Sequence, residues 1–365
     1  MKLWQIAALI VAGLAVGEAR PGFLADTFRT ATLYVFLPAL IFEAAWQLDA
    51  QLMLRAWRPI VLLAIPGVAI TAGFIAAVAY FLGGLGLAAA LVLGAALSAT
   101  DPVAVVAIFR RLNVPPLLAT IVECESLLND AVAVVIYRAV IAAVALAASA
   151  SVVERVSLLA LVGSLLSVVA GIGIAYVGSF ALRKNVPLVL QTLVTFGCAY
   201  AAYFASDAFA GSGIFAVIAC GITLRALERG YAGVATRDGV ERAWHVAAIV
   251  ANAALFFLVG AAVEMGHIWA QRSILAWTIG AALAARFFLA YGLLSLVPRL
   301  ARSWKAVVRL AGVRGALSLA LALGVPPALP QRGVIVDVTF AVVIVTILIG
   351  SLTYERRIER LDLGE

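Results

Sequence analysis

Apolar residues run along this chain in long, nearly uninterrupted blocks, and short polar loops separate the blocks. A helix needs about 20 mostly apolar residues to cross a bilayer. By that measure the pattern predicts an all-α, polytopic membrane protein with about twelve transmembrane helices. The predicted segments are 3–17, 31–48, 59–82, 85–109, 116–148, 156–182, 187–206, 209–226, 243–264, 273–297, 306–325 and 333–353.

The composition agrees with this pattern. Of 365 residues, 65% are hydrophobic and only 12% are charged, whereas about 25% of the residues of a soluble protein are charged. These fractions exclude a soluble enzyme and also a disordered chain, which would be poor in apolar residues. The net charge of +7 fits the loops of a membrane protein and does not predict nucleic-acid binding. Cys124, Cys198 and Cys220 lie in apolar stretches, so neither a disulfide framework nor a metal cluster is expected.

The basic residues in the loops predict the orientation of the chain. If both termini face one side, 18 of the 26 Lys and Arg lie on that side, 5 on the other and 3 within helices. Cytoplasmic loops carry the excess of basic residues, so both termini are expected in the cytoplasm. A bacterial inner membrane is the default location. Residues 3–17 also fit a cleavable signal peptide, which would leave eleven spans.

Charged residues interrupt the predicted spans, although a charge at mid-bilayer costs about 2.5–3.5 kcal/mol. They either pair only to hold helices together or form an ion or proton path, and we favour the path. Glu123 and Arg138 lie nearer the ends of their helix and are interpreted as interfacial. The charged residues within or at the ends of spans are Glu43, Asp101, Glu123, Glu125, Asp130, Arg138, Arg286, Arg314 and Asp337.

One stretch of acidic and polar residues carries the most information. Ser126 and Asp130 are four residues apart and share a helix face, as do Glu125 and Asn129. Glu125 and Asp130 are separated by about 140° around the axis, so both cannot face one small ion. Asp130 and Ser126 can offer oxygens to a cation. Glu125 needs a basic partner, and the mid-span Arg286 is the best candidate.

The fourth span is predicted to break at Thr100-Asp101-Pro102. Pro102 lacks an N–H and disfavours a helical conformation at Asp101. Broken backbone at membrane depth is tolerated only where it is buried in protein or lines a cavity. The freed carbonyls, the Thr100 hydroxyl and the Asp101 carboxylate would form an oxygen site suited to a cation. A simple proline kink is the alternative.

A counterpart break is predicted at residues 312–318 in the eleventh span. Spans 3–5 and 10–12 then correspond, each triplet with its interrupted helix in the middle. Their offset of seven helices is odd, so the second triplet runs upside down relative to the first. Inverted repeats with paired, crossing broken helices mark secondary transporters. Arg314 would place a fixed positive charge beside the helix ends at this crossing.

Six short motifs occur in order between about residue 30 and residue 353. They are Phe-Leu-Pro-Ala-Leu-Ile-Phe-Glu-Ala at 36–44, Thr-Asp-Pro at 100–102, Glu-Ser-Leu-Leu-Asn-Asp at 125–130, Ser-Gly-Ile-Phe-Ala-Val at 212–217, Phe-Leu-Val-Gly at 257–260 and Arg-Gly-Ala-Leu-Ser at 314–318. With these motifs the chain resembles the monovalent cation/proton antiporter family of the bacterial NhaP and animal sodium/proton exchanger type. The resemblance implies an NhaA/NhaP-like antiporter fold and an exchange of a monovalent cation for a proton.

The resemblance also implies roles for individual residues. Asp130 would alternately hold the cation and the proton. Asp101, Ser126 and Thr100 would lie near the ion, with Glu43 reaching it through water. Proton and cation would then compete for one carboxylate.

Further implied roles are structural. Glu125 and Arg286 would form a salt bridge, as the helical geometry independently suggests. Asn129 places the chain in the Asn-Asp branch, which is typically electroneutral and exchanges one cation for one proton. The sequence does not choose between Na⁺, Li⁺ and K⁺, and Na⁺ is the first expectation. No cofactor is expected.

The resemblance divides the chain into working parts. Residues 59–148 and 266–353 would form the ion-transporting core. Residues 1–58 and 149–265 would form a scaffold that contacts lipid and a second copy in a homodimer, and 354–365 a short cytoplasmic tail. A cation channel is one alternative. An intramembrane aspartyl protease, with Asp101 and Asp130 as its dyad, is the other.

Overall fold

The computed structural model describes residues 3–19, 30–101, 103–145, 150–182, 186–209, 211–228, 234–261, 271–298, 300–361 and 363. These residues form helices joined by short connections, and none of them lies in a strand. The elements are α1 (Leu3–Ala19), η1 (Thr32–Phe36), α3 (Leu37–Gln47), α4 (Ala50–Arg55), α5 (Trp57–Leu62), η2 (Leu63–Gly67), α6 (Val68–Phe81), α7 (Leu87–Ser98), α8 (Val103–Leu112), α9 (Pro116–Ala145), α10 (Ala150–Ala181), α11 (Leu188–Ala205), η3 (Ser206–Phe209), α12 (Gly213–Glu228), α13 (Val234–Ala261), α15 (Arg272–Tyr291), η4 (Leu293–Leu296), α16 (Arg302–Leu310), α17 (Ala316–Leu323) and α18 (Arg332–Glu359).

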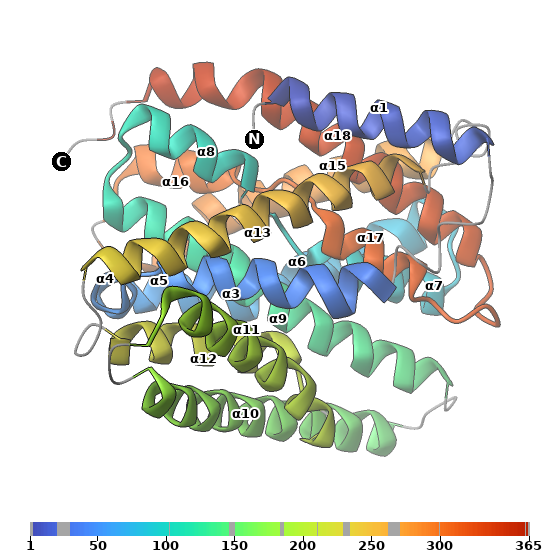
Figure 1. Cartoon of the computed structure of the whole chain (residues 1–365). Helices are drawn as coiled ribbons and strands as arrows, with labels where there is room; N and C mark the ends of the chain where they lie inside the picture. The colour runs from blue at the N-terminus through green and yellow to red at the C-terminus, as the bar shows by residue number, and fades with distance from the viewer. Residues whose placement is uncertain are drawn as a thin grey trace.

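The helices lie side by side in one bundle (Figure 1). The helix α10 packs against α11 and α12 along one edge of the bundle, and α1 packs on α13 near the other edge. The helix α3 joins these groups because it contacts both α12 and α13. A second set of contacts links α6, α7, α9, α15, α17 and α18.

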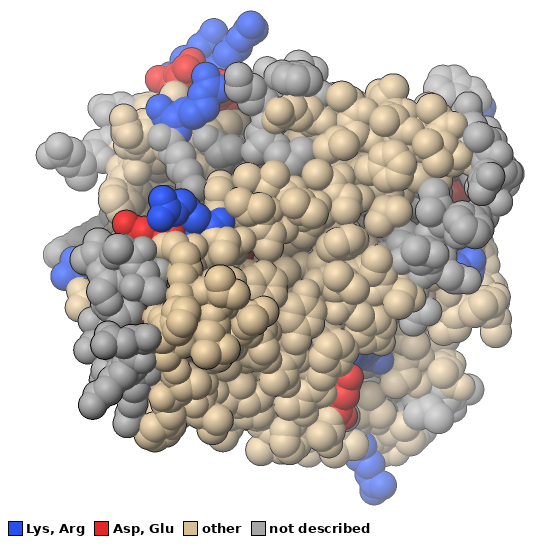
Figure 2. Space-filling model, viewed as in Figure 1, with Lys and Arg blue, Asp and Glu red and all other residues tan. Residues whose placement is uncertain are grey.

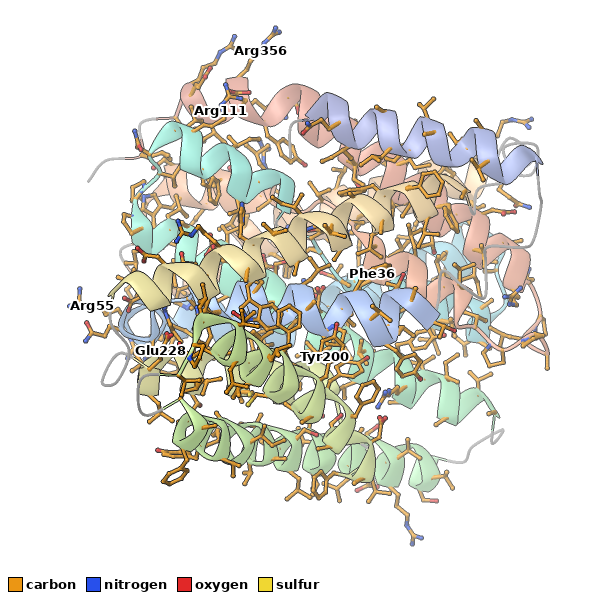
Figure 3. All side chains as sticks on the ribbon, viewed as in Figure 1. Phe36, Arg55, Arg111, Tyr200, Glu228 and Arg356 are labelled. Atoms are coloured by element: carbon orange, nitrogen blue, oxygen red, sulfur yellow. The ribbon has the colours of Figure 1, made fainter. Side chains whose placement is uncertain are left out.

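The exposed surface of this bundle is apolar rather than polar. Large hydrophobic side chains such as Leu158, Leu165, Val169 and Val177 on α10 are 58–72% exposed. Figure 2 shows a broad surface without charged side chains, and the labelled Arg55, Arg111 and Arg356 in Figure 3 lie toward one end of the bundle. An apolar belt with charges at the ends is the surface that a bilayer requires.

Among the residues that the structure describes, seven helices are long and apolar enough to cross a membrane. Three shorter apolar helices, Ala8–Gly17, Thr32–Gln47 and Leu87–Ser98, accompany them. The all-α membrane fold is therefore confirmed, while the count of twelve spans stays a prediction. The seven long helices are Trp57–Phe81, Pro116–Ala145, Glu154–Ala181, Leu188–Phe209, Asp238–Ala261, Arg272–Leu296 and Arg332–Gly350.

Both expected interruptions are present among the described residues. The predicted span 85–109 consists of α7 and α8 with a non-helical link between them, and Pro102 itself lies outside the described residues. The predicted span 306–325 begins earlier, at Arg302, and divides into α16 and α17. All eight residues of α17 are buried, as are nine of the 12 residues of α7. A short helix that is apolar on every side belongs in the interior of a bundle, so the two broken helices meet at its centre.

Close packing of α1 on α13 depends on glycine. A side chain at Gly260 would meet the backbone of Ile10, and one at Gly13 would meet the backbone of Phe257 and Ala261. Small residues at helix interfaces let backbones approach closely in membrane proteins. This contact fixes α13, which forms one wall of the cavity described below.

We predict that Gly260→Leu lowers the unfolding temperature of the purified protein in detergent, because overpacking costs about 1–3 kcal/mol. Gly280→Leu on α15 is the matched control, since nothing lies within 4 Å of the place its side chain would occupy. Equal unfolding temperatures for the two variants would contradict the packing described here.

Candidate ion-binding site

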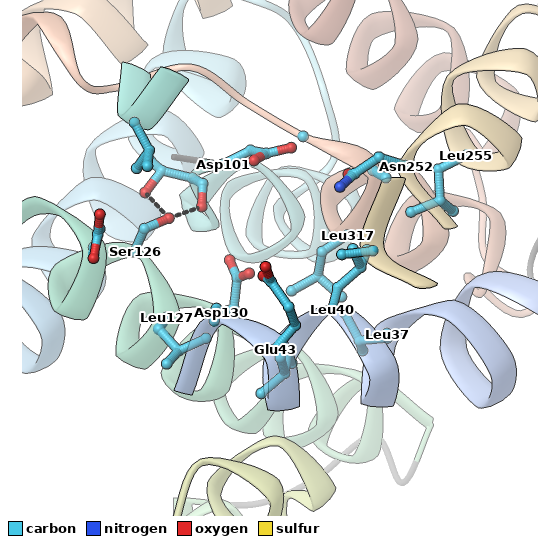
Figure 4. Close-up of a pocket in the computed structure, with 18 of the residues that line it drawn as sticks. Leu37, Leu40, Glu43, Asp101, Ser126, Leu127, Asp130, Asn252, Leu255 and Leu317 are labelled. Atoms are coloured by element: carbon cyan, nitrogen blue, oxygen red, sulfur yellow. Dashed lines mark hydrogen bonds between the residues drawn. The ribbon is translucent and has the colours of Figure 1, made fainter. Parts of the chain in front are cut away.

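A cavity of about 420 Å³ lies where α3, α9 and α13 meet the two interrupted helices (Figure 4). Leu37, Leu40, Leu127, Leu255 and Leu317 form part of its apolar wall. The polar residues that line it are Thr32, Glu43, Gln47, Thr100, Asp101, Glu123, Ser126, Asp130, His245, Asn252 and Ser318.

All five residues expected at the ion line this one cavity: Glu43, Thr100, Asp101, Ser126 and Asp130. They come from three separate parts of the chain. In Figure 4 the carboxylates of Glu43 and Asp130 point toward the same space, Asp101 lies across it, and Ser126 lies between Asp130 and the link that carries Asp101. The cavity thus collects carboxylate, hydroxyl and carbonyl oxygens, which are the ligands that hard monovalent cations take.

The end of α7 is held by side chains of α9. The Ser126 hydroxyl donates a hydrogen bond to the Thr100 carbonyl, and the Thr100 hydroxyl lies 3.5 Å from the Ser126 oxygen. The amide of Asn129 donates to the Thr100 hydroxyl at 3.1 Å. These bonds pair the carbonyl and the hydroxyl of Thr100 with α9, and Thr100 and Asp101 line the cavity.

The two broken helices hold each other at the crossing. The backbone N–H of Asp101 donates to the Val313 carbonyl at 2.8 Å. The Arg314 guanidinium, which is 1% exposed, donates to the carbonyls of Ser98 and Ala99 at 3.0 and 3.1 Å. A cation at a helix C-terminus offsets the negative end of the helix dipole. Arg314 therefore lies beside the C-terminal end of α7, in agreement with the position predicted from the sequence.

Glycine makes this crossing possible. A side chain at Gly315 would overlap the Asp101 side chain, and one at Gly312 would lie within 2.9 Å of three atoms of Arg286. Gly315 therefore lets the two links approach each other, and Gly312 leaves room for the Arg286 side chain of α15.

Glu125 and Arg286 form the expected ion pair beside the cavity. Two hydrogen bonds of 2.8 and 3.1 Å join the Arg286 guanidinium to the Glu125 carboxylate. The Arg286 side chain is 4% exposed and the Glu125 side chain 1%. Asn129 donates to Glu125 as well, at 3.3 Å. A continuous chain of hydrogen bonds thus runs from Arg286 through Glu125 and Asn129 to Thr100.

One end of the cavity is open. The His245 side chain is 52% exposed, and its Nδ1 lies 3.4 Å from Glu43 Oε1. The Gln47 amide also donates to Glu43. These residues form a polar mouth that leads inward to Asp130.

Sequence reasoning missed five polar residues of the cavity: Thr32, Gln47, His245, Asn252 and Ser318. His245 and Asn252 are seven residues apart on α13, so they share a face after two turns; this spacing was the available signal. Ser318 ends the Arg-Gly-Ala-Leu-Ser motif at 314–318, but the sequence predicts no role for its side chain. The interfacial interpretation of Glu123 was incomplete, because Glu123 lines the cavity.

Arg138 does lie at an exposed position, where it donates to the Gly211 carbonyl at 2.7 Å.

In the part of the chain that the structure describes, no group of three or more His, Cys, Asp or Glu is arranged to hold a metal ion. The three cysteines are buried and unpaired with one another.

Paired broken helices that cross beside an oxygen-lined cavity are typical of secondary transporters. Residues 1–356 match the family described as sodium/hydrogen exchanger, transmembrane. The chain therefore belongs to the sodium/hydrogen exchanger family and is an integral membrane protein, so the resemblance read from its motifs is confirmed.

Individual relatives agree with this assignment. The chain is 35% identical over 341 residues to the Na⁺/H⁺ antiporter ApNhaP of Aphanothece halophytica, covering 91% of this chain and 64% of that protein. It is 28% identical over 375 residues to the Na⁺/H⁺ antiporter NhaH of Halobacillus aidingensis, covering 98% and 92%. The fold matches the sodium proton antiporter MjNhaP1 of Methanocaldococcus jannaschii with a TM-score of 0.81 at 20% identity, covering 99% and 92%. The chain spans 64% of the length of ApNhaP and likewise 64% of NhaS1 of Synechocystis, to which it is 33% identical.

We predict that Arg286→Met destabilises the protein strongly, because it leaves Glu125 as an uncompensated buried charge. Breaking a buried pair in this way costs about 3–5 kcal/mol. The double variant Glu125→Gln/Arg286→Met should recover most of the lost unfolding temperature in detergent.

The control for this prediction is Arg111→Met. It breaks the exposed Arg111–Glu355 pair, 3.0 Å long, and should cost about 1 kcal/mol or less. A double variant that melts below Arg286→Met would show that the pair is not the stabilising interaction.

Proposed function

We propose that this protein is a secondary transporter, not an enzyme, that exchanges a monovalent cation, first of all Na⁺, for H⁺ across a membrane. The observation that carries the proposal is the cavity in which Asp101 and Asp130 face the oxygens of Thr100 and Ser126 at a helix crossing. Relatives in the same family are named Na⁺/H⁺ antiporters. Neither the channel nor the protease alternative finds support among these relatives.

The proposed mechanism is competition for one carboxylate. Asp130 holds either the cation or the proton, never both, so each substrate displaces the other. Asp101, the Ser126 hydroxyl and the Thr100 oxygens complete the cation's shell, and Glu43 contributes through water. The Thr100 carbonyl accepts one hydrogen bond from Ser126 and keeps a second lone pair for an ion. The exchange is one for one, and no cofactor takes part.

The cavity also indicates which way the proposed site faces. Its open mouth, marked by His245 and Gln47, lies at the end of α3 that precedes the basic residues Arg55, at the end of α4, and Arg58, in α5. Under the predicted topology this end is cytoplasmic, as are both termini, in a bacterial inner membrane. The opposite end is closed, since Thr32 is 0% and Phe256 5% exposed. The structure then corresponds to a state that exchanges ions with the cytoplasm.

The proposed movement divides the chain as the repeats suggest. Residues 59–148 and 266–353 form a core that carries the occupied site, and residues 1–58 and 149–265 form a scaffold. The contacts of α10 with α12 and of α1 with α13 fall within the scaffold, and those of α7 with α9 and α17 within the core. The apolar face of α10 is where lipid or the second copy of a homodimer would pack.

We predict that Asp130→Asn abolishes exchange, because the amide neither titrates nor carries a charge for the cation. The assay uses everted vesicles with an imposed proton gradient, a pH-sensitive dye, and additions of Na⁺, Li⁺ and K⁺ in turn. Asp337→Asn is the control, since Asp337 is also an acid within a helix but does not line the cavity. Equal responses of wild type and Asp130→Asn would remove Asp130 from the proposed role.

We further predict that lowering the pH raises the apparent KM for the cation while the maximal rate at saturating cation changes little. Competition for Asp130 requires this, because a proton must leave before the cation binds. The measurement is cation-dependent exchange at several pH values in the same vesicles. An apparent KM that does not change with pH would exclude competition at a single site.

A further inference from the structure

The closed end of the cavity contains polar groups that the proposed cation site does not use. Thr32 on η1 and Ser318 on α17 both line the cavity, and both side chains are 0% exposed. Among the residues that the structure describes, neither hydroxyl has a hydrogen-bond partner. A buried hydroxyl left unpaired costs about 1–3 kcal/mol, so two such groups at one end of a cavity require an explanation.

Most buried hydroxyls on helices of this chain are satisfied locally. They donate to a backbone carbonyl one turn earlier, as is usual for Ser and Thr in membrane helices. Ser318 lacks this option because the residue four positions earlier, Arg314, lies in the non-helical link. Examples of the usual arrangement are Thr71 to Gly67, Thr120 to Pro116, Ser167 to Gly163 and Thr278 to Ile274, at 2.7–2.9 Å.

The two hydroxyls lie at the same end of the cavity. Thr32 lies eleven residues before Glu43, a distance of about 16 Å along a helix, on the side of the site away from His245. The elements η1, α13 and α17 contact one another there. Leu255, Phe256 and Leu317 are 3–5% exposed and close the cavity at this end.

We propose that Thr32 and Ser318 line the half of the ion path that opens on the side opposite His245. This inference rests on the proposed exchange and adds the residues of its second exit. A cation that leaves Asp130 toward the closed side loses carboxylate ligands before it regains water. The two hydroxyls supply oxygens over that stretch, with the amide of Asn252, which points into the cavity in Figure 4, between them and the site. In the present state the leucine and phenylalanine side chains cover them.

The test is the reactivity of single cysteines toward a membrane-impermeant maleimide added to one side of sealed vesicles. Thr32→Cys and Ser318→Cys should react from the side opposite His245→Cys. The matched control is Thr339→Cys on α18, which replaces another fully buried hydroxyl without a partner among the described residues, but outside the cavity. The wild-type protein gives the background, because its three cysteines are buried.

We expect Thr32→Cys and Ser318→Cys to react at least about ten-fold faster than Thr339→Cys, since a state populated at even 0.1–10% exposes them intermittently. Addition of the transported cation should change these two rates and leave that of Thr339→Cys unchanged. Reaction only from the His245 side, or at the rate of Thr339→Cys from both sides, would overturn the inference.

If the cysteine variants do not fold, the exchange rates of two milder variants test the same inference. Thr32→Val and Ser318→Ala should reduce the maximal exchange rate several-fold without changing the half-saturating cation concentration on the His245 side. An unchanged maximal rate in both variants would also overturn the inference. The proposed function is tested independently of these variants: a wild-type protein that shows no cation-dependent proton movement would contradict it.

Discussion

The contact between the two helix breaks is the interaction on which the rest of this structure depends. A helix that ends inside a bundle leaves backbone groups unpaired, and away from water each such group costs several kcal/mol. Here Arg314 binds the last carbonyls of α7, and the Asp101 N–H binds the Val313 carbonyl. Each break therefore supplies what the other lacks. The oxygens left over after this pairing face the cavity, and they form the candidate cation site.

The charges around the crossing follow from the same constraint. Arg314 and Arg286 bring two positive charges into the interior, and Glu125, Asp101 and Asp130 bring three negative charges. Glu125 is held by Arg286, which leaves one positive charge, Arg314, against the carboxylates of Asp101 and Asp130. Glu43 and Glu123 also line the cavity, so its ionisable groups carry an excess of negative charge that one bound cation or one proton reduces by one. Replacing the cation by a proton leaves the net charge of the site unchanged, as the proposed one-for-one exchange requires.

Much of this arrangement could be predicted because it depends on local chemistry. Proline after Asp101 and glycine around Arg314 predicted the two breaks, and the four-residue spacing of Ser126 and Asp130 predicted their common face. Glu125 needed a cation, and Arg286 had no local acid. The inward orientation of Asn252 and Ser318 could not be derived in this way. The rotation of α13 and α17 about their axes is set by the helices that surround them. Ser318 is the one polar residue of α17, and the shared face of His245 and Asn252 on α13 does not show which way that face points. For the same reason Glu123 was interpreted as interfacial although it lines the cavity.

The most direct measurement of the central claim is the number of protons released when the purified protein binds its cation. Titration calorimetry in two buffers with different ionisation enthalpies gives that number. If Asp130 alternately holds the two ions, about one proton leaves per cation bound at a pH where the site is protonated, and Asp130→Asn neither binds the cation nor releases a proton. Cation binding with no proton release at any pH would contradict exchange at one carboxylate.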